Sequence, residues 1–291
     1  MLNIHLSFRQ IRETVIVVGI VIFSILLFPH FLYAAEPHAS IPAIRKLQEK
    51  GSIVIGIPPY NTPPFYYREP ATSELLGYDI EICQALAQKL GVKAIFDESS
   101  SSFNDLVARA GRGDVDVAIG KLGTTYARLF NAHPHVYMKF QQALLLNRKT
   151  LVGIGNEKDP ELGRKIKKSN IRIAVIHNSA YDVRAALEFP NATIVPTATW
   201  DDAVQFLRSG KVEAIYRDSL EIAMLTRRDP KLTLQFASVI IADLDDVKSI
   251  FLGEANSGLG PLIDFLIADQ YPTVDEQKIM NIYPQFFRST G

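Results

Sequence analysis

Short apolar runs alternate along this chain with amphipathic segments whose apolar residues repeat at a helical spacing. In the first half we predict strands at 52–57, 93–96, 115–119 and 142–146, and helices at 79–90 and 103–110. Asp79 is the predicted N-cap of its helix, and Gly91 is the predicted stop signal. This alternation favours a mainly parallel α/β sheet covered by helices.

The pattern restarts after a polar stretch at residues 151–169, which we expect to be rich in loops. The second half predicts strands at 171–176, 193–195, 212–216 and 248–252, a returning apolar run at 232–241, and helices at 180–187, 201–208, 220–227, 260–268 and 274–282. The order helix, polar turn, apolar strand occurs both in 103–119 and in 200–216. We therefore expect two similar α/β lobes with a ligand cleft between them.

The N-terminus has the pattern of a secretory signal. Arg9 and Arg12 precede an apolar run at 15–28, and Ala34 and Ala35 follow near its end. We predict a signal peptide at 1–35 that directs the chain to the periplasm, with an uncleaved membrane anchor as the alternative.

Composition excludes some function classes. Lys and Arg together number 31, as do Asp and Glu, so the formal net charge is zero, which argues against nucleic-acid binding. Cys83 is the single cysteine, so no internal disulfide is possible, and we expect it to be buried in its helix. An exported chain of this size without a disulfide favours a bacterial periplasm.

The segment Gly111–Arg128 carries the clearest candidate chemistry. A polar turn leads into the predicted strand 115–119, after which small residues, hydroxyls and Arg128 follow at the start of a helix. Free backbone N–H groups and a guanidinium at such a corner could bind a carboxylate. The alternative is a structural turn with a surface arginine.

Several motifs in order resemble one family. They are Leu47–Gly51 before the first strand, Pro63-Pro64-Phe65, Gly77-Tyr78-Asp79, Gly113–Asp116 followed by Thr125–Arg128, and Gly210–Ala214 followed by Asp218. Together they resemble the bacterial extracellular solute-binding proteins of family 3, the periplasmic polar-amino-acid-binding components of ABC transporters. The resemblance covers about 41–283. It implies a type II periplasmic-binding-protein-like fold, in which two hinged lobes close on a ligand.

The resemblance also implies a division of the chain. Lobe 1 would comprise 36–147 and 247–291, and lobe 2 would comprise 148–246. The hinges would fall near 142–148 and 242–248.

The same resemblance implies a set of binding residues. Arg128 matches the arginine that pairs with the ligand α-carboxylate, and Asp218 matches the acid that receives the α-ammonium, with a helix N-cap as the alternative. Ser179 matches a hydroxyl that could donate to the carboxylate, cap a helix, or do both. Phe103 matches an aromatic wall over the ligand, and Tyr60, near Pro63-Pro64-Phe65, is a candidate for another wall, although either could be a core residue.

Three positions depart from the family pattern. Gly123 stands where a serine or threonine is common, although Thr124 could compensate. Lys121 stands where a small residue is usual, and Arg217 stands beside Asp218 where small or apolar residues are common. Additional positive charge in the cleft would favour a ligand with more than one anionic group. The alternative is that Lys121 points to solvent and pairs with a surface carboxylate.

The sequence is compatible with three functions. The first is a monomeric periplasmic protein that needs no cofactor and delivers an amino acid or organic acid to an ABC permease. The second is a dehydratase for cyclic carboxylates on the same scaffold, which needs a general acid such as Asp218, Lys121 or His177. The third is a membrane-anchored sensory domain. His133 and His135 are too sparse for a metal site.

Overall fold

The computed structural model describes residues 39–156, 159–272 and 274–288. The predicted signal peptide at 1–35 therefore lies outside the described residues. From Ile41 onward the chain forms one compact unit. Among the described segments, no helix has the length and apolar character needed to cross a membrane.

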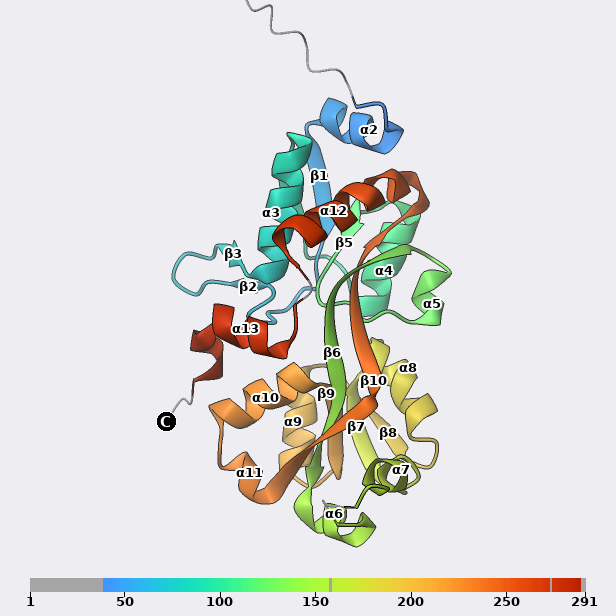
Figure 1. Ribbon diagram of the computed structural model, residues 1–291, viewed down its shortest axis with the longest axis vertical. Helices are drawn as coiled ribbons and strands as arrows, with labels where there is room; N and C mark the ends of the chain where they lie inside the picture. Colours follow the sequence, from blue (N-terminus) through green and yellow to red (C-terminus); the bar gives the residue numbers. More distant parts are fainter. Residues whose placement is uncertain (1–38, 157–158, 273, 289–291) are drawn as a thin grey trace, which may run out of the picture. The chain divides into compact units, whose positions relative to one another are not determined.

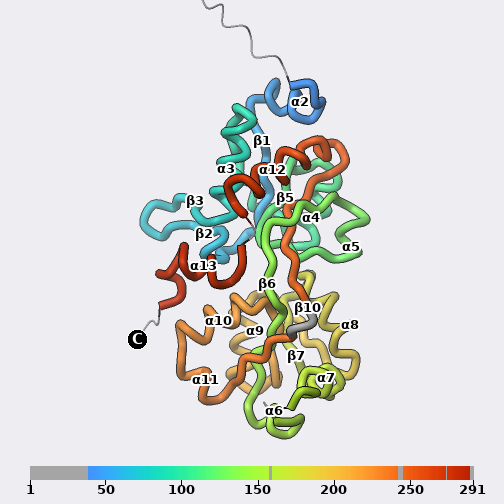
Figure 2. The backbone as a smooth tube through the Cα atoms, viewed as in Figure 1, coloured from blue at the N-terminus to red at the C-terminus, as the bar shows by residue number. Residues whose placement is uncertain are grey.

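The described chain contains one mixed sheet of eight strands in the order β4-β1-β5-β10-β6-β9-β7-β8. Two long strands, β6 (His133–Asn147) and β10 (Phe236–Leu252), pair antiparallel along most of their length and form the middle of this sheet. They run side by side through both halves of the fold (Figures 1 and 2). The molecule therefore has the predicted two lobes, joined by this pair of strands. Where each lobe ends along the chain stays a prediction, because both strands contribute to both lobes.

Lobe 1 is built on three strands and the helices around them. The strands are β1 (Ser52–Gly56), β4 (Lys93–Asp97) and β5 (Val117–Ala118), beside a hairpin of β2 (Tyr67–Arg68) and β3 (Leu75–Leu76). The helices are α2 (Pro42–Lys50), α3 (Tyr78–Leu90), α4 (Phe103–Arg112) and α5 (Tyr126–Leu129), with η1 (Glu254–Leu259), α12 (Gly260–Gln270), α13 (Glu276–Ile282) and η2 (Pro284–Phe287) from the C-terminal part. Apolar side chains of β1, α3 and α12 form a large part of its core, which includes Cys83. The C-terminal helices thus complete a lobe that the N-terminal part begins.

Lobe 2 repeats this arrangement. Its strands are β7 (Arg172–Ile176), β8 (Thr193–Thr197) and β9 (Ala214–Asp218), and β7 is parallel to both of the others. Its helices are α6 (Arg148–Ile154), α7 (Leu162–Lys167), α8 (Ala180–Glu188), α9 (Trp200–Arg208), α10 (Ser219–Arg228) and α11 (Leu232–Gln235). Its apolar side chains pack in two clusters.

The structure corrects several sequence predictions. The polar stretch 151–169 contains most of α6 and all of α7, because Leu151, Leu162 and Ile166 are buried. The apolar runs at 232–241 and 248–252 belong to one continuous strand. Asp79 is not an N-cap: α3 begins after Gly77, and the buried Asp79 carboxylate accepts hydrogen bonds from the Lys121 backbone N–H and the Tyr137 hydroxyl.

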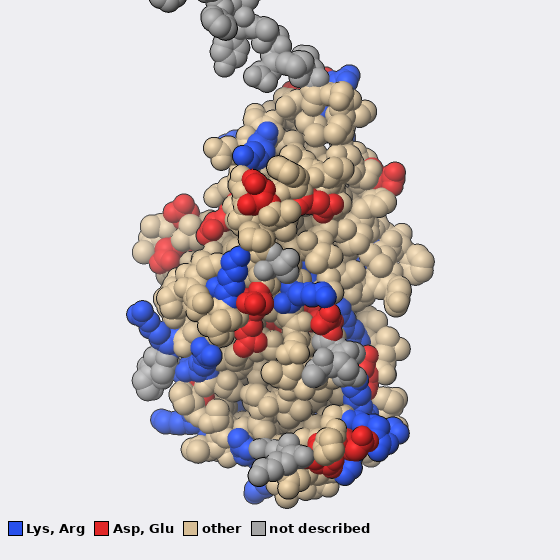
Figure 3. Space-filling model, in the orientation of Figure 1, with Lys and Arg blue, Asp and Glu red and all other residues tan. Residues whose placement is uncertain are grey.

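Charged side chains of both signs are interspersed on the face shown in Figure 3. Most ion pairs between the described residues involve exposed groups, such as Arg112 with Asp114 and Arg208 with Asp229. Exposed pairs of this kind contribute little stability, typically about 0–1 kcal/mol each. The pairs buried between the lobes differ, and they define the candidate site.

Candidate functional site

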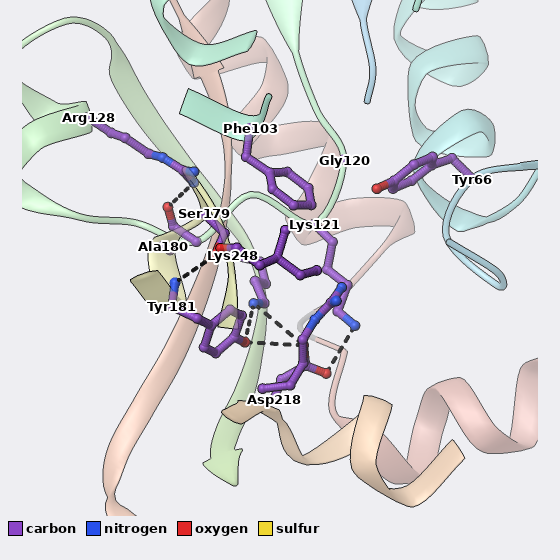
Figure 4. A pocket seen from close by; sticks show the side chains of 13 residues that line it. Tyr66, Phe103, Gly120, Lys121, Arg128, Ser179, Ala180, Tyr181, Asp218 and Lys248 are labelled. Atoms are coloured by element: carbon purple, nitrogen blue, oxygen red, sulfur yellow. Dashed lines mark hydrogen bonds and ion pairs between the residues drawn. The ribbon is translucent and has the colours of Figure 1, made fainter. Parts of the chain in front are cut away.

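A small cavity of about 20 Å³ lies where the end of β5 and the loop after it face β9 and the start of α8. A volume of this order holds about one water molecule. Its lining comes from both lobes (Figure 4) and consists of Tyr66, Phe103, Gly120, Lys121, Gly123, Arg128, Ile176, Ser179, Ala180, Tyr181, Arg217, Asp218 and Lys248. We call this the inner cavity. Four lining residues are cations and one is a carboxylate, so the inner cavity has an excess of positive charge.

Arg128 is a buried cation held by neutral groups. Its Nε and Nη2 donate to Asn104 Oδ1 at 3.0 and 2.8 Å, and its Nη1 donates to the Gly123 carbonyl at 2.7 Å. No carboxylate of the described residues forms an ion pair with it, within a 4.0 Å limit. Burial, together with the nearby Arg184 charge, lowers the Arg128 pKa to about 10. Burial thus disfavours the charged form of this guanidinium, and an anion that binds to it would stabilise that charged form.

Lys121 points into the cleft and not into solvent. Its ammonium lies 2.7 Å from Glu221 Oε1 and 3.0 Å from Asp218 Oδ1, and the residue is 6% exposed. Asp218 is the last residue of β9, and it caps α10 by accepting the Glu221 N–H. The N-cap role considered for Asp218 is therefore present, and the ammonium that Asp218 faces is that of Lys121. A contact between Asp218 and a ligand α-ammonium stays a prediction.

Positive charges around Asp218 control its protonation. Burial alone would raise the pKa of its carboxyl group. Lys121, Lys248 and Arg217 outweigh that effect and hold the Asp218 pKa well below its usual range. Arg217 in turn has its pKa raised because Glu221 and Asp218 outweigh the effect of its burial. Asp218 and Arg217 are therefore charged at neutral pH.

A second set of buried charges was not predicted from sequence. Asp246 accepts from Lys248 Nζ at 2.5 Å, from Arg184 Nη1 at 2.6 Å, and from the Tyr181 hydroxyl. The same hydroxyl lies 3.2 Å from Asp218 Oδ2, so the two sets of charges are connected. The signal in the sequence was the pair Asp246 and Lys248, two residues apart in a strand and therefore on one face of it.

The remaining predicted residues are placed as follows. Ser179 caps α8 by accepting from the Tyr181 and Asp182 N–H groups, and it lines the inner cavity as well. Thr124 bonds Ser249 through its hydroxyl at 2.8 Å and borders neither cavity described here, so the structure gives no support for compensation of Gly123. His177 is an exposed partner of Asp182.

Phe103 and Tyr60 form an edge-to-face pair with ring centroids 5.4 Å apart. Phe103 lines the inner cavity, whereas Tyr60 lines a larger adjoining cavity of about 610 Å³. The larger cavity also has contributions from both lobes, including Trp200 and Met224. Ile176 and Arg217 border both cavities, so the two spaces meet at these residues.

Close approach of the lobes depends on Gly123. A Cβ atom on this residue would lie 2.7 Å from the Ala180 Cβ at the start of α8. We expect Gly123→Thr to hold the lobes apart, measured as a larger radius of gyration by small-angle X-ray scattering. Gly153→Ala is the matched control, because a Cβ there meets nothing within 4 Å. An unchanged radius for Gly123→Thr would contradict the expectation.

The sequence and fold of this chain are similar to those of known solute-binding proteins. Residues 53–174 match the sequence profile of the bacterial extracellular solute-binding proteins, family 3. Across these residues the chain is similar to that family. The chain is also similar to the glutamine-binding protein of Geobacillus stearothermophilus, with 22% identity over 203 residues, which cover 68% of this chain and 72% of that protein.

Solved structures show the same fold. One is the arginine-bound AbpA, an amino acid ABC transporter substrate-binding protein from Streptococcus pneumoniae, with a TM-score of 0.66 and 18% identity over 83% of this chain and 97% of that one. Another is an ancestral amino-acid-binding protein described as a precursor of cyclohexadienyl dehydratase, with a TM-score of 0.63 and 19% identity over 84% of this chain and 99% of that one. This chain therefore has the two-lobed type II fold predicted from its sequence.

Proposed function

We propose that this chain is a periplasmic solute-binding protein that captures a small polar solute carrying a carboxylate and delivers it to an ABC permease in the inner membrane. The observation that carries the proposal is Arg128, a buried guanidinium that lines the inner cavity without a carboxylate partner among the described residues. A carboxylate can accept two parallel hydrogen bonds from such a group. The match of residues 53–174 to the family's sequence profile and the amino-acid-binding structural neighbours support a binding role.

Binding would be coupled to motion of the lobes. The inner cavity is too small for an amino acid or a dicarboxylate, so the lobes have to separate before a solute can enter. The antiparallel pairing of β6 and β10 shifts register between Ile241 and Asp245, close to where β6 begins to pair with β9. We propose this zone, which overlaps the predicted hinges, as the place where the two strands bend. Closure of the lobes over the solute would then present the loaded protein to the permease.

The test is a thermal-shift screen of the purified protein against amino acids and organic acids, followed by calorimetry of every solute that raises the melting temperature. A solute present at about 1,000 times its Kd stabilises the folded protein by roughly 4 kcal/mol. We expect at least one carboxylate to bind and Arg128→Met to weaken its binding at least 100-fold. Arg164→Met, at a side chain 61% exposed, is the matched control. Unchanged affinity in Arg128→Met would refute the proposal.

We propose binding without catalysis. A dehydratase needs a general acid that can reach the leaving hydroxyl. Of the candidates named from sequence, Lys121 and Asp218 are paired with each other, and His177 is exposed beside Asp182. Formation of product from prephenate or arogenate by the purified protein would instead support the enzyme.

A further inference from the structure

Lys121 is held in an unusual backbone conformation that directs its side chain inward. Its φ angle is +54°, in the left-handed region. Its N–H donates to Asp79 Oδ2 and to the Tyr137 oxygen, both at 3.0 Å. The side chain therefore leaves a fixed backbone and enters the inner cavity, where Figure 4 shows it beside Asp218.

The surroundings of the Lys121 ammonium are those of an ammonium-binding site. Two carboxylates, those of Asp218 and Glu221, lie within 3.0 Å. The rings of Phe65 and Phe140 face the same nitrogen, with centroids at 4.7 and 5.6 Å. Carboxylates and aromatic faces are the groups that bind organic ammonium ions. In this protein the ammonium of Lys121 occupies the place that a ligand ammonium would take in such a site.

The remaining carboxylate oxygens near the cavity are also paired with groups of this chain. Asp218 Oδ2 faces the Tyr181 hydroxyl and Lys248, and Asp246 is shared among Lys248, Arg184 and Tyr181. Among the described residues, Arg128 and Arg217 are the lining cations left to meet a solute, and both are donors. Arg128 has no carboxylate partner among the described residues, and the buried Nη1 of Arg217 has no hydrogen-bond partner.

We propose that Lys121 sets the ligand class, so that this protein binds carboxylic acids that lack an α-ammonium group, such as dicarboxylates and 2-oxo acids, in preference to α-amino acids. This inference rests on the proposed binding function. An amino acid would bring a second ammonium to a cavity in which every neighbouring carboxylate is paired, and would be repelled by the surrounding cations. An amine-free acid brings only acceptors to Arg128 and Arg217.

Arg217 also indicates where the far end of such an acid lies. It borders both cavities, and its guanidinium lies over the Trp200 ring at 5.1 Å. An acid anchored on Arg128 would extend past Arg217 toward the larger cavity. A second acceptor group at that end, a carboxylate or a carbonyl, can accept from the unpaired Nη1.

The test compares matched acids on the unmodified protein. Calorimetry at low salt would measure glutarate and 2-oxoglutarate against L-glutamate, and succinate against L-aspartate. We expect the amine-free acid of a pair to bind at least 10-fold more tightly. Equal or tighter binding of the amino acids overturns this inference and leaves the proposed function standing, whereas absence of binding by these acids and by every carboxylate in the wider screen overturns both.

A substitution tests the role of Lys121 directly. In Lys121→Met the ammonium is removed at similar side-chain length, so Asp218 Oδ1 and Glu221 Oε1 lose their nearest cation and can accept a ligand ammonium. We expect the preference for amine-free acids to fall at least 10-fold, while Lys93→Met, at an exposed position, leaves it unchanged. Lys121→Arg, which keeps the positive charge, should retain the preference. An unchanged preference in a folded Lys121→Met protein overturns the inference, and should that variant not fold, the matched acids on the unmodified protein decide.

Discussion

Replacing Asp246 by alanine is expected to lower the free energy of unfolding by about 3–5 kcal/mol, because it leaves two buried cations without their carboxylate. Lys248 and Arg184 lie 2.5 and 2.6 Å from this side chain, and Asp246 has no exposed surface. The Lys248 pKa is already lowered because its burial outweighs the effects of Asp246 and Asp218. Urea denaturation followed by circular dichroism at pH 7.5 measures the effect.

Asp245 provides a matched control for this substitution. It is the preceding residue in the same strand, its side chain is 61% exposed, and its partner Lys139 is exposed too. Asp245→Ala should change the free energy of unfolding by less than about 1 kcal/mol. If Asp246→Ala changed the free energy of unfolding by as little as Asp245→Ala, the buried charges between the lobes would not contribute to stability as the geometry requires.

The second large effect concerns pH. Burial raises the pKa of Asp79 from 3.8 to about 7, although the hydrogen bonds from Tyr137 and the Lys121 N–H oppose this. The folded protein therefore holds this proton up to about pH 7, whereas the unfolded chain releases it near pH 4. Stability due to Asp79 thus falls as pH rises from 4 to 7 and is constant above that. Between pH 5 and pH 8 the loss is about 2–3 kcal/mol.

Asp79→Asn removes this titration while keeping a side-chain oxygen for the same hydrogen bonds. We expect the variant to gain about 2–3 kcal/mol relative to the unmodified protein when urea denaturation at pH 8 is compared with that at pH 5. Glu49→Gln, at an exposed carboxylate of α2, controls for the loss of a negative charge. A stability difference that is the same at both pH values would show that Asp79 is ionised throughout.

Much of the fold followed from local patterns in the sequence. The boundaries predicted for β1, β4 and β7 agree with the structure to within one residue, because apolar runs bounded by polar turns leave little choice. The boundaries of the central strands were harder to predict. Residues 242–247 carry several charges, so the pattern predicts a break between two strands, whereas the structure continues one strand through them. Pairing with β6 up to Ile241 and again from Asp245 onward holds the strand on either side of this segment, and local sequence carries no information about that partner.

The candidate site was predicted in outline and not in its internal pairing. Arg128, Asp218, Ser179 and Phe103 do line one cavity, as the family resemblance implied. The ion pair between Lys121 and Asp218 was not foreseen, because it joins residues from different lobes that are far apart in sequence. Side-chain direction at Lys121 follows from its positive φ angle, which no pattern of apolar and polar residues encodes.

The long pair of β6 and β10 has a consequence for the order in which the lobes can form when the chain emerges N-terminus first. Strand β5 of lobe 1 pairs with β10 at Phe251, and α12 and α13 come later still. The strands β6, β7, β8 and β9, by contrast, have all been made once residue 218 is synthesised. The lobe whose first residues emerge first is therefore completed last, and until β10 emerges the edge of β5 opposite β1 has no strand beside it.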